Sequence, residues 1–167
     1  IIGSTFPNPS VFAILVESDK QFRDNKIISF GHTSSGGRPH AEANTLENVH
    51  FKKNKIYTLY STLEPCCHEG RDESCVSKIL KSKKINRVIF SLIDPDKRVN
   101  GKGKKILKKN NLEVKSGWLE NKIKNLYQGY ILNRKENRPK IILKLAITKD
   151  GYITFEKGKI TKITNLI

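Results

Sequence analysis

The chain has 167 residues, enough for one well-buried domain and too few for two domains of ordinary size. It contains no run of about 18 apolar residues, so we expect no membrane-spanning segment. Its net charge of +16 often indicates a nucleic-acid partner. Because the lysines are spread over most segments, we interpret this charge as solvated faces and expect no nucleic-acid partner.

Apolar periodicity predicts strands and helices in alternation. In chain order we expect a hairpin of strands at 12–17 and 26–30, a helix at 40–48, a strand at 56–61, a helix at 75–82, a strand at 87–93, a helix at 102–109, a strand at 112–115 and a longer helix at 119–134. This order indicates an α/β domain whose helices cover both faces of a sheet. A charged stretch at 134–139 ends it, and a strand at 141–147 and a turn at Asp150 and Gly151 are predicted beyond.

Metal-binding side chains stand in two tripeptides, His-Ala-Glu and Glu-Pro-Cys, which contribute His40, Glu42 and Cys66, and Cys75 follows after eight further residues. Structural zinc sites normally have four protein ligands, whereas catalytic sites keep three and leave a position for water. The pattern predicts a catalytic site in which His40, Cys66 and Cys75 bind zinc. Glu42 would then take a proton from the activated water and pass it to the substrate.

A structural zinc site is the main alternative, with Cys67 or His68 as the fourth ligand. Against it, Cys66 and Cys67 are neighbours in the chain, and neighbours rarely both face one tetrahedral ion. Three cysteines also make a poor disulfide framework. They fit metal-bound thiolates in a reducing compartment, so we expect a cytoplasmic protein. Helix N-termini are expected to lower the pKa of the cysteines at this site.

Further motifs occur in order along nearly the whole chain. They are Thr-Phe-Pro-Asn-Pro at 5–9, Ser-Thr-Leu-Glu-Pro-Cys-Cys-His-Glu-Gly-Arg at 61–71, Asp-Pro-Asp at 94–96, Val-Asn-Gly-Lys-Gly at 99–103, Arg-Pro at 138–139 and Lys-Leu-Ala-Ile-Thr-Lys-Asp-Gly at 144–151. In these motifs and in its long cysteine gap, the chain resembles the bifunctional riboflavin-biosynthesis proteins, which fuse a pyrimidine deaminase to a pyrimidine reductase.

The resemblance implies a three-layer α/β/α fold like that of cytidine deaminase, with a central mixed sheet, over residues 1–137. Residues 138–167 would begin a truncated reductase domain that resembles dihydrofolate reductase. The implied reaction is zinc-dependent hydrolytic deamination of 2,5-diamino-6-(5-phosphoribosylamino)pyrimidin-4(3H)-one to 5-amino-6-(5-phosphoribosylamino)uracil. Reduction of the ribose with NADPH would follow if the natural chain continues.

The same resemblance assigns roles to single residues. His40, Cys66 and Cys75 match the zinc ligands, and Glu42 matches the proton donor. The residues that match substrate-contacting positions are Asn8, His68, Asp94 and, in the reductase remnant, Lys144. Ala146 matches a position near the nicotinamide cofactor.

Some residues depart from the family pattern, and we expect each to matter. Phe12 replaces a Gly and would crowd its neighbours, and Cys67 replaces a Ser and adds a competing thiol. The sequence Asp-Glu-Ser at 72–74 replaces Thr-Pro-Pro and would loosen the loop that presents Cys75. Asp96 replaces an Asn and would place a second carboxylate near an anionic substrate.

Other functions stay open at this point. A tRNA or nucleotide deaminase of the same fold would suit the basic charge, and a catalytically impaired, zinc-stabilised binding module would suit the substitutions. Both ends look cut, and the opening helix of the family is absent, so we expect a fragment. The family also suggests a possible homo-oligomer.

Overall fold

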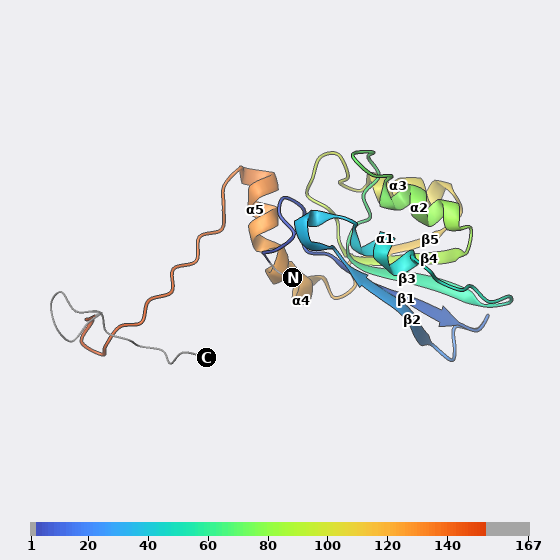
Figure 1. Ribbon diagram of the computed structural model, residues 1–167, viewed down its shortest axis with the longest axis horizontal. Helices are drawn as coiled ribbons and strands as arrows, with labels where there is room; N and C mark the ends of the chain where they lie inside the picture. The colour runs from blue at the N-terminus through green and yellow to red at the C-terminus, as the bar shows by residue number, and fades with distance from the viewer. Residues whose placement is uncertain (1–2, 153–167) are drawn as a thin grey trace.

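The computed structural model describes residues 3–152 of the chain. A five-stranded mixed sheet forms its centre, in the order β2-β1-β3-β4-β5 (Figure 1). The strands are β1 Phe12–Ser18, β2 Lys26–His32, β3 Ile56–Leu63, β4 Ile85–Leu92 and β5 Glu113–Ser116. β1 runs antiparallel to β2 and β3, whereas β3, β4 and β5 are parallel. The predicted hairpin and central strands are therefore confirmed, with ends that differ by one to two residues.

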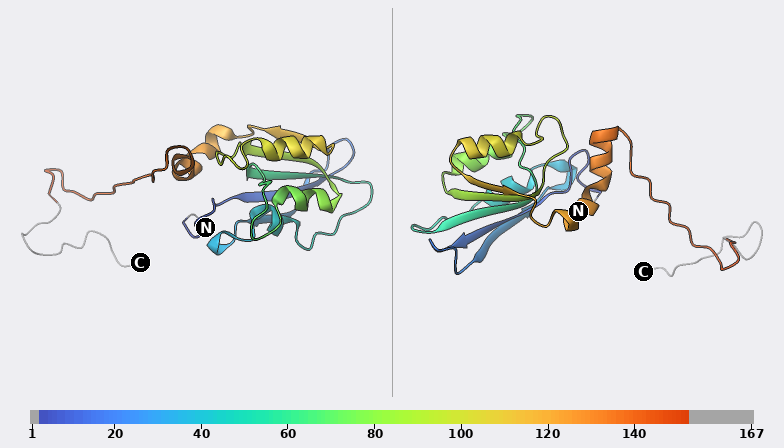
Figure 2. Two further views of the ribbon diagram at one scale, coloured as in Figure 1. Left: turned by 90° about the horizontal axis from the view of Figure 1, so that it is seen from above. Right: turned by 180° about the vertical axis from the view of Figure 1, so that it is seen from behind.

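Three helices pack against one another on one face of the sheet: α1 Ala41–Leu46, α2 Cys75–Ser82 and α3 Lys102–Lys109 (Figures 1 and 2). Alternate side chains of the strands point to this face because successive residues of a strand point to opposite sides. The core that results includes Leu15, Leu59, Val88 and Phe90 of the sheet and Val76, Ile79 and Leu107 of the helices. The predicted metal-binding residues lie where two of these helices begin: α1 starts directly after His40, and α2 starts at Cys75.

The predicted helix at 119–134 is wrong as a single element. The structure has α4 Glu120–Lys124, a 3-10 turn Asn125–Tyr127 and α5 Gln128–Glu136. Leu119 has a left-handed backbone (φ 56°), so the helix begins only after it. Tyr127 then turns inward, and its hydroxyl hydrogen bonds with the Thr62 hydroxyl (2.6 Å) and the Ser10 carbonyl (2.9 Å). Anchoring this buried side chain accounts for the tightened turn.

The second face of the sheet is covered in part, near β4, by α4 (Figure 2). Trp118 lies against Tyr60 on this face, with 5.3 Å between ring centroids. Phe12 is 44% exposed and stacks on Phe30 at 6.3 Å. The expectation that Phe12 would crowd its neighbours is therefore wrong, because its ring points to an open part of the sheet.

Beyond α5 the chain is extended and leads away from the sheet (Figure 1). Residues 141–147 are exposed and pair with no strand among the described residues. A strand needs a neighbour for its hydrogen bonds, so the strand predicted here stays a prediction, as do the domain limits 1–137 and 138–167. The turn near Gly151 is confirmed by its N–H bond to the Thr148 carbonyl at 3.0 Å. Within the described residues, no helix is long and apolar enough to cross a membrane.

Candidate metal centre and substrate pocket

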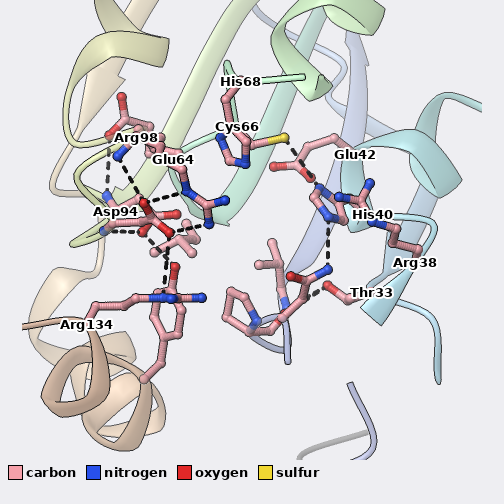
Figure 3. Close-up of a pocket in the computed structure, with 17 residues that line it drawn as sticks. Thr33, Arg38, His40, Glu42, Glu64, Cys66, His68, Asp94, Arg98 and Arg134 are labelled. Carbon is pink, nitrogen blue, oxygen red and sulfur yellow. Dashed lines mark hydrogen bonds and ion pairs between the residues drawn. The ribbon is translucent and has the colours of Figure 1, made fainter. Parts of the chain in front are cut away.

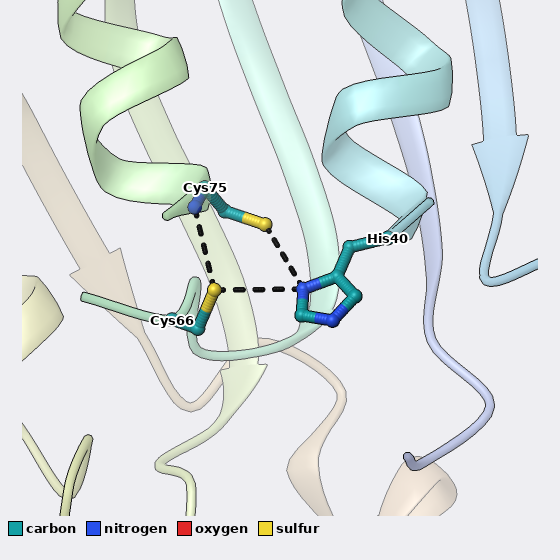
Figure 4. A group of neighbouring side chains, drawn as sticks. All are labelled: His40, Cys66 and Cys75. Atoms are coloured by element: carbon teal, nitrogen blue, oxygen red, sulfur yellow. Dashed lines mark hydrogen bonds between the residues drawn. The ribbon is translucent and has the colours of Figure 1, made fainter. Parts of the chain in front are cut away.

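The two cysteines and the histidine of the predicted zinc site come together beneath α1 and α2 (Figure 4). Nδ1 of His40 lies 3.5 Å from Sγ of Cys66 and 3.4 Å from Sγ of Cys75. The three donor atoms all lie within 4.8 Å of one another. With ordinary Zn–N and Zn–S bond lengths, a tetrahedral ion separates such donors by about 3.6 Å. The side chains therefore fit a zinc ion in spacing and in chemistry.

Each of these residues is held by local structure. His40 precedes α1 with an extended backbone (φ −72°, ψ 160°), and Cys75 is the first residue of α2. Cys66 lies in the loop after β3, and its sulfur accepts the Cys75 N–H at 3.3 Å. Because His40 is outside the helix, it and Glu42 can approach one place although residues two apart do not share a helix face.

The pKa of the two thiols moves in opposite directions. Interaction with the Cys75 side chain, and then with His40, lowers the pKa of Cys66 to about 4. The same interaction with Cys66, together with burial, raises the pKa of Cys75. Cys66 is thus the thiol of this pair that ionises first, because its sulfur accepts hydrogen bonds from the Cys75 backbone N–H and side chain.

Glu42 is buried beside the cluster. Its Oε1 accepts a hydrogen bond from the Ser61 hydroxyl at 3.2 Å, and its Oε2 lies 3.4 Å from Sγ of Cys75. Burial raises the pKa of this carboxyl. Asn8 approaches from the other side, where its Nδ2 lies 3.4 Å from Nε2 of His40 and donates to the Gly37 carbonyl at 2.8 Å.

The proposed fourth ligands of a structural zinc site are not in the cluster. The Cys67 thiol is directed to the backbone carbonyl of Arg98 at 3.6 Å, which turns it away from Cys66. His68 lines the neighbouring pocket, and its buried Nδ1 has no hydrogen-bond partner among the described residues. The donor set is therefore three protein atoms with a carboxylate beside them, which is the pattern of an open, catalytic site.

A pocket that is partly open to solvent leads from this cluster (Figure 3). His40, Glu42 and Cys66 lie at one end. The other end carries the charged residues Asp94, Arg98 and Arg134 (Figure 3). Predicted substrate contacts Asn8, His68 and Asp94 all line it, and Lys144 and Ala146 do not. The last two are exposed on the extended segment after α5, so their roles stay predictions.

Asp94 and Asp96 differ in environment although they are two residues apart. Burial raises the pKa of Asp94 to about 6, and its Oδ1 accepts hydrogen bonds from the Tyr130 hydroxyl (2.9 Å) and the Asp96 N–H (2.8 Å). The Arg98 guanidinium binds Asp96 at 2.6 and 3.0 Å and lowers the pKa of Asp96. The Asp96 carboxylate, which replaces an Asn of the family pattern, is therefore paired with the Arg98 guanidinium.

The loop that presents Cys75 is tied down rather than loosened, contrary to expectation. Asp72 forms an ion pair with Arg38 at 3.0 Å, and Glu73 forms one with Lys81 at 2.6 Å. The Ser74 hydroxyl accepts the Ser77 N–H at 3.1 Å and so caps α2. These side-chain contacts restrain the loop, whereas the prolines of the family pattern would restrain it by fixing the backbone φ angle.

Several pocket residues escaped the sequence analysis. Glu64 stood in a quoted motif without a role, yet its buried carboxylate accepts backbone N–H bonds from Asp94, Gly101 and Lys104. The position of Glu64 in the Glu-Pro-Cys motif was the one feature of the sequence that could have indicated this role. Arg38, Tyr130 and Arg134 carried no signal, because their roles depend on contacts with distant segments.

Comparison with known proteins agrees with this geometry. Residues 3–92 match the family model described as the cytidine and deoxycytidylate deaminase zinc-binding region. The chain is 36% identical over 163 residues to riboflavin biosynthesis protein RibD of Aquifex aeolicus, which covers 98% of this chain and 44% of that protein. It thus spans less than half the length of that relative.

Two further relatives extend the comparison. Diaminohydroxyphosphoribosylamino-pyrimidine deaminase of Buchnera aphidicola is 36% identical over 136 residues, which covers 81% of this chain and 87% of that protein. The solved deaminase/reductase structure from Thermotoga maritima is 33% identical, with a TM-score of 0.85 over 98% of this chain and 45% of that one. The chain therefore belongs to the zinc-binding cytidine and deoxycytidylate deaminase family, and within it to the diaminohydroxyphosphoribosylaminopyrimidine deaminases.

Proposed function

We propose that this chain catalyses the hydrolytic deamination of 2,5-diamino-6-(5-phosphoribosylamino)pyrimidin-4(3H)-one to 5-amino-6-(5-phosphoribosylamino)uracil, with release of ammonia. The observation that carries the proposal is the open donor set of His40, Cys66 and Cys75 with Glu42 beside it, at one end of a pocket that is also lined by Asp94, Arg98 and Arg134. The names of the deaminase relatives supply the substrate.

His40, Cys66 and Cys75 would hold the zinc ion through Nδ1 and the two sulfurs. When bound, zinc makes water a nucleophile near neutral pH. The neighbouring groups then keep the ligands in place. Cys75 N–H holds the Cys66 sulfur, and the Asp72–Arg38 ion pair fixes the loop between them.

Glu42 would move the protons of the reaction. Its Oε2 would accept one proton of the attacking water and deliver it to a pyrimidine ring nitrogen. It would then carry the second proton of that water, from the hydroxyl group added to the ring carbon, to the amine that departs as ammonia. Ser61 binds the other oxygen, Oε1, and so leaves Oε2 directed at the cluster. A carboxylate fixed in this way loses little orientation entropy in the transition state.

The remaining lining would bind the substrate. Asn8 and the unpartnered Nδ1 of His68 lie near the metal ligands and would contact the ring, and Asp94 would contact the ribose. A buried ring nitrogen without a partner is costly, and a polar ligand group would remove that cost. In this proposal the substrate is a small molecule and there is no nucleic-acid or membrane partner. A reducing, cytoplasmic location is part of the same proposal and is supported by the thiolate ligands.

We assign no NADPH-dependent step to the described residues, and the reductase activity, with Lys144 and Ala146, stays a prediction for a longer chain. A homo-oligomer likewise stays a prediction. The deaminase proposal is tested by ammonia release from the diaminopyrimidine phosphate by purified, zinc-loaded protein. Absence of turnover by protein that contains about one zinc per chain would refute it and favour a zinc-stabilised binding module.

A further inference from the structure

Arg134 has a buried donor in the pocket that no group of the described residues binds. The side chain comes from α5 and lines the pocket end opposite His40 (Figure 3). Its nearest anion is Asp96, with Nε of Arg134 3.6 Å from Oδ2. That Nε is buried and has no hydrogen-bond partner among the described residues. A guanidinium offers five N–H donors, so this arginine can still bind an anion.

Tyr130 and Asp96 hold Arg134 in place and leave its Nε without a hydrogen bond. Its guanidinium lies over the Tyr130 ring, 5.4 Å from the centroid. The Tyr130 hydroxyl is in turn bound to Asp94 at 2.9 Å. Asp96 attracts Arg134, but its carboxylate accepts hydrogen bonds from Arg98, namely from the backbone N–H, Nε and Nη2. Asp96 thus acts as a positioning residue for two guanidinium groups.

The carboxylates at this end leave the donors of Arg134 available to a ligand. Asp96 stands between two arginines but forms its hydrogen bonds with Arg98 and only a longer ion pair with Arg134. Asp94 lies at the same end of the pocket. Burial raises the pKa of Asp94 to about 6, so Asp94 ionises less readily than Asp96. Glu64 is also close, but its oxygens are occupied by three backbone N–H groups.

We propose that Arg134 is the residue that binds the phosphate of the substrate. This inference rests on the proposed function, because the substrate named there carries its phosphate at the end remote from the reacting carbon. In the pocket, Arg134 likewise lies at the end remote from the metal ligands (Figure 3). Arginine binds phosphate with paired, charge-assisted hydrogen bonds, and a planar fork suits it better than a lysine.

The direct test is binding of ribose 5-phosphate to zinc-loaded protein by calorimetry, with ribose as the uncharged comparison. Arg134→Gln should weaken ribose 5-phosphate binding by about 10- to 100-fold, the loss expected for one charged hydrogen-bonded contact. Lys135→Gln is the matched control, since it removes the same charge from the adjacent, exposed position outside the pocket. Arg134→Lys should fall between wild type and Arg134→Gln.

Two results would overturn the inference. One is wild-type protein that binds ribose 5-phosphate no more tightly than ribose. The other is Arg134→Gln protein that binds ribose 5-phosphate as tightly as the Lys135→Gln control. Ammonia release by wild-type protein is measured separately, so failure of the deaminase proposal and failure of the phosphate assignment give different results. If turnover occurs, Arg134→Gln should raise KM about tenfold or more with little change in kcat.

Discussion

The carboxylate of Glu64 accepts a hydrogen bond from the backbone N–H of Lys104 at 2.9 Å and so ties the end of β3 to the first turn of α3. The same carboxylate binds the N–H groups of Asp94 and Gly101. It satisfies donors at the start of a helix and in the loop before it, where a negative charge is also favoured by the helix dipole. Cys66 follows two residues later, so this anchor also fixes one predicted zinc ligand.

Glu64→Gln should therefore destabilise the protein by about 2–4 kcal/mol, because a buried amide leaves at least one of these donors unpaired. Urea unfolding of zinc-loaded protein measures the change. Glu69→Gln, at an exposed position of the following loop, is the control and should change the free energy of unfolding by less than about 0.5 kcal/mol. Equal stability of the two variants would show that the Glu64 contacts carry no net energy.

Glu42→Gln should reduce the rate of ammonia release by about 10²–10⁴-fold and leave the zinc content unchanged. The amide keeps the size of the side chain and can still bind Ser61, but it cannot carry the proton. Glu47→Gln, just after α1 and exposed, is the matched control. Zinc loss in Glu42→Gln would contradict the assignment, since it would make Glu42 a ligand or a structural support of the cluster.

Much of this architecture was predictable because local patterns determine it. Alternation of apolar residues located the hairpin and the parallel strands, and the combination of His40, Glu42, Cys66 and Cys75 located the metal cluster. The break near Tyr127 was missed because its cause is a contact with Thr62 and Ser10, which lie far away in the sequence. Apolar periodicity indicates which face of a helix is buried, but it does not identify the residues that this face contacts.

The charged end of the pocket was missed for the same reason. Asp96 was expected to place a second carboxylate near an anionic substrate, and that expectation did not include Arg98 two residues later or Arg134 on α5, which both pair with Asp96. The loop at 72–74 was expected to be loose, and the ion pair of Asp72 with Arg38 spans 34 residues of sequence. Long charged side chains choose partners by tertiary proximity, so a single sequence does not reveal whether they are paired.

Cys75→Ser and Cys67→Ser should separate an open zinc site from a closed one. Cys75→Ser removes a predicted ligand and should weaken zinc binding by more than about 100-fold, beyond the effect of losing an outer contact. Cys67→Ser should keep about one zinc per chain, because that thiol faces the Arg98 carbonyl. Metal analysis after dialysis against a weak chelator measures both. Loss of zinc from both variants would indicate that Cys67 is a fourth ligand.

Asp94→Asn should change how stability depends on pH. The folded pKa of Asp94 is about 6, against 3.8 for the ordinary group, so the folded state binds the proton more tightly than the unfolded state. Its favourable contribution is complete below pH of about 4 and is lost as the pH rises through about 6. Wild type should therefore lose about 2–3 kcal/mol of unfolding free energy relative to Asp94→Asn between pH 4 and pH 7.

Asparagine keeps an oxygen that can accept from Tyr130 and from the Asp96 N–H, so the comparison isolates the charge. Asp24→Asn, at an exposed turn, should run parallel to wild type in the same urea titrations. If the wild-type and Asp94→Asn curves are also parallel from pH 4 to pH 7, the carboxyl of Asp94 does not titrate differently in the folded protein.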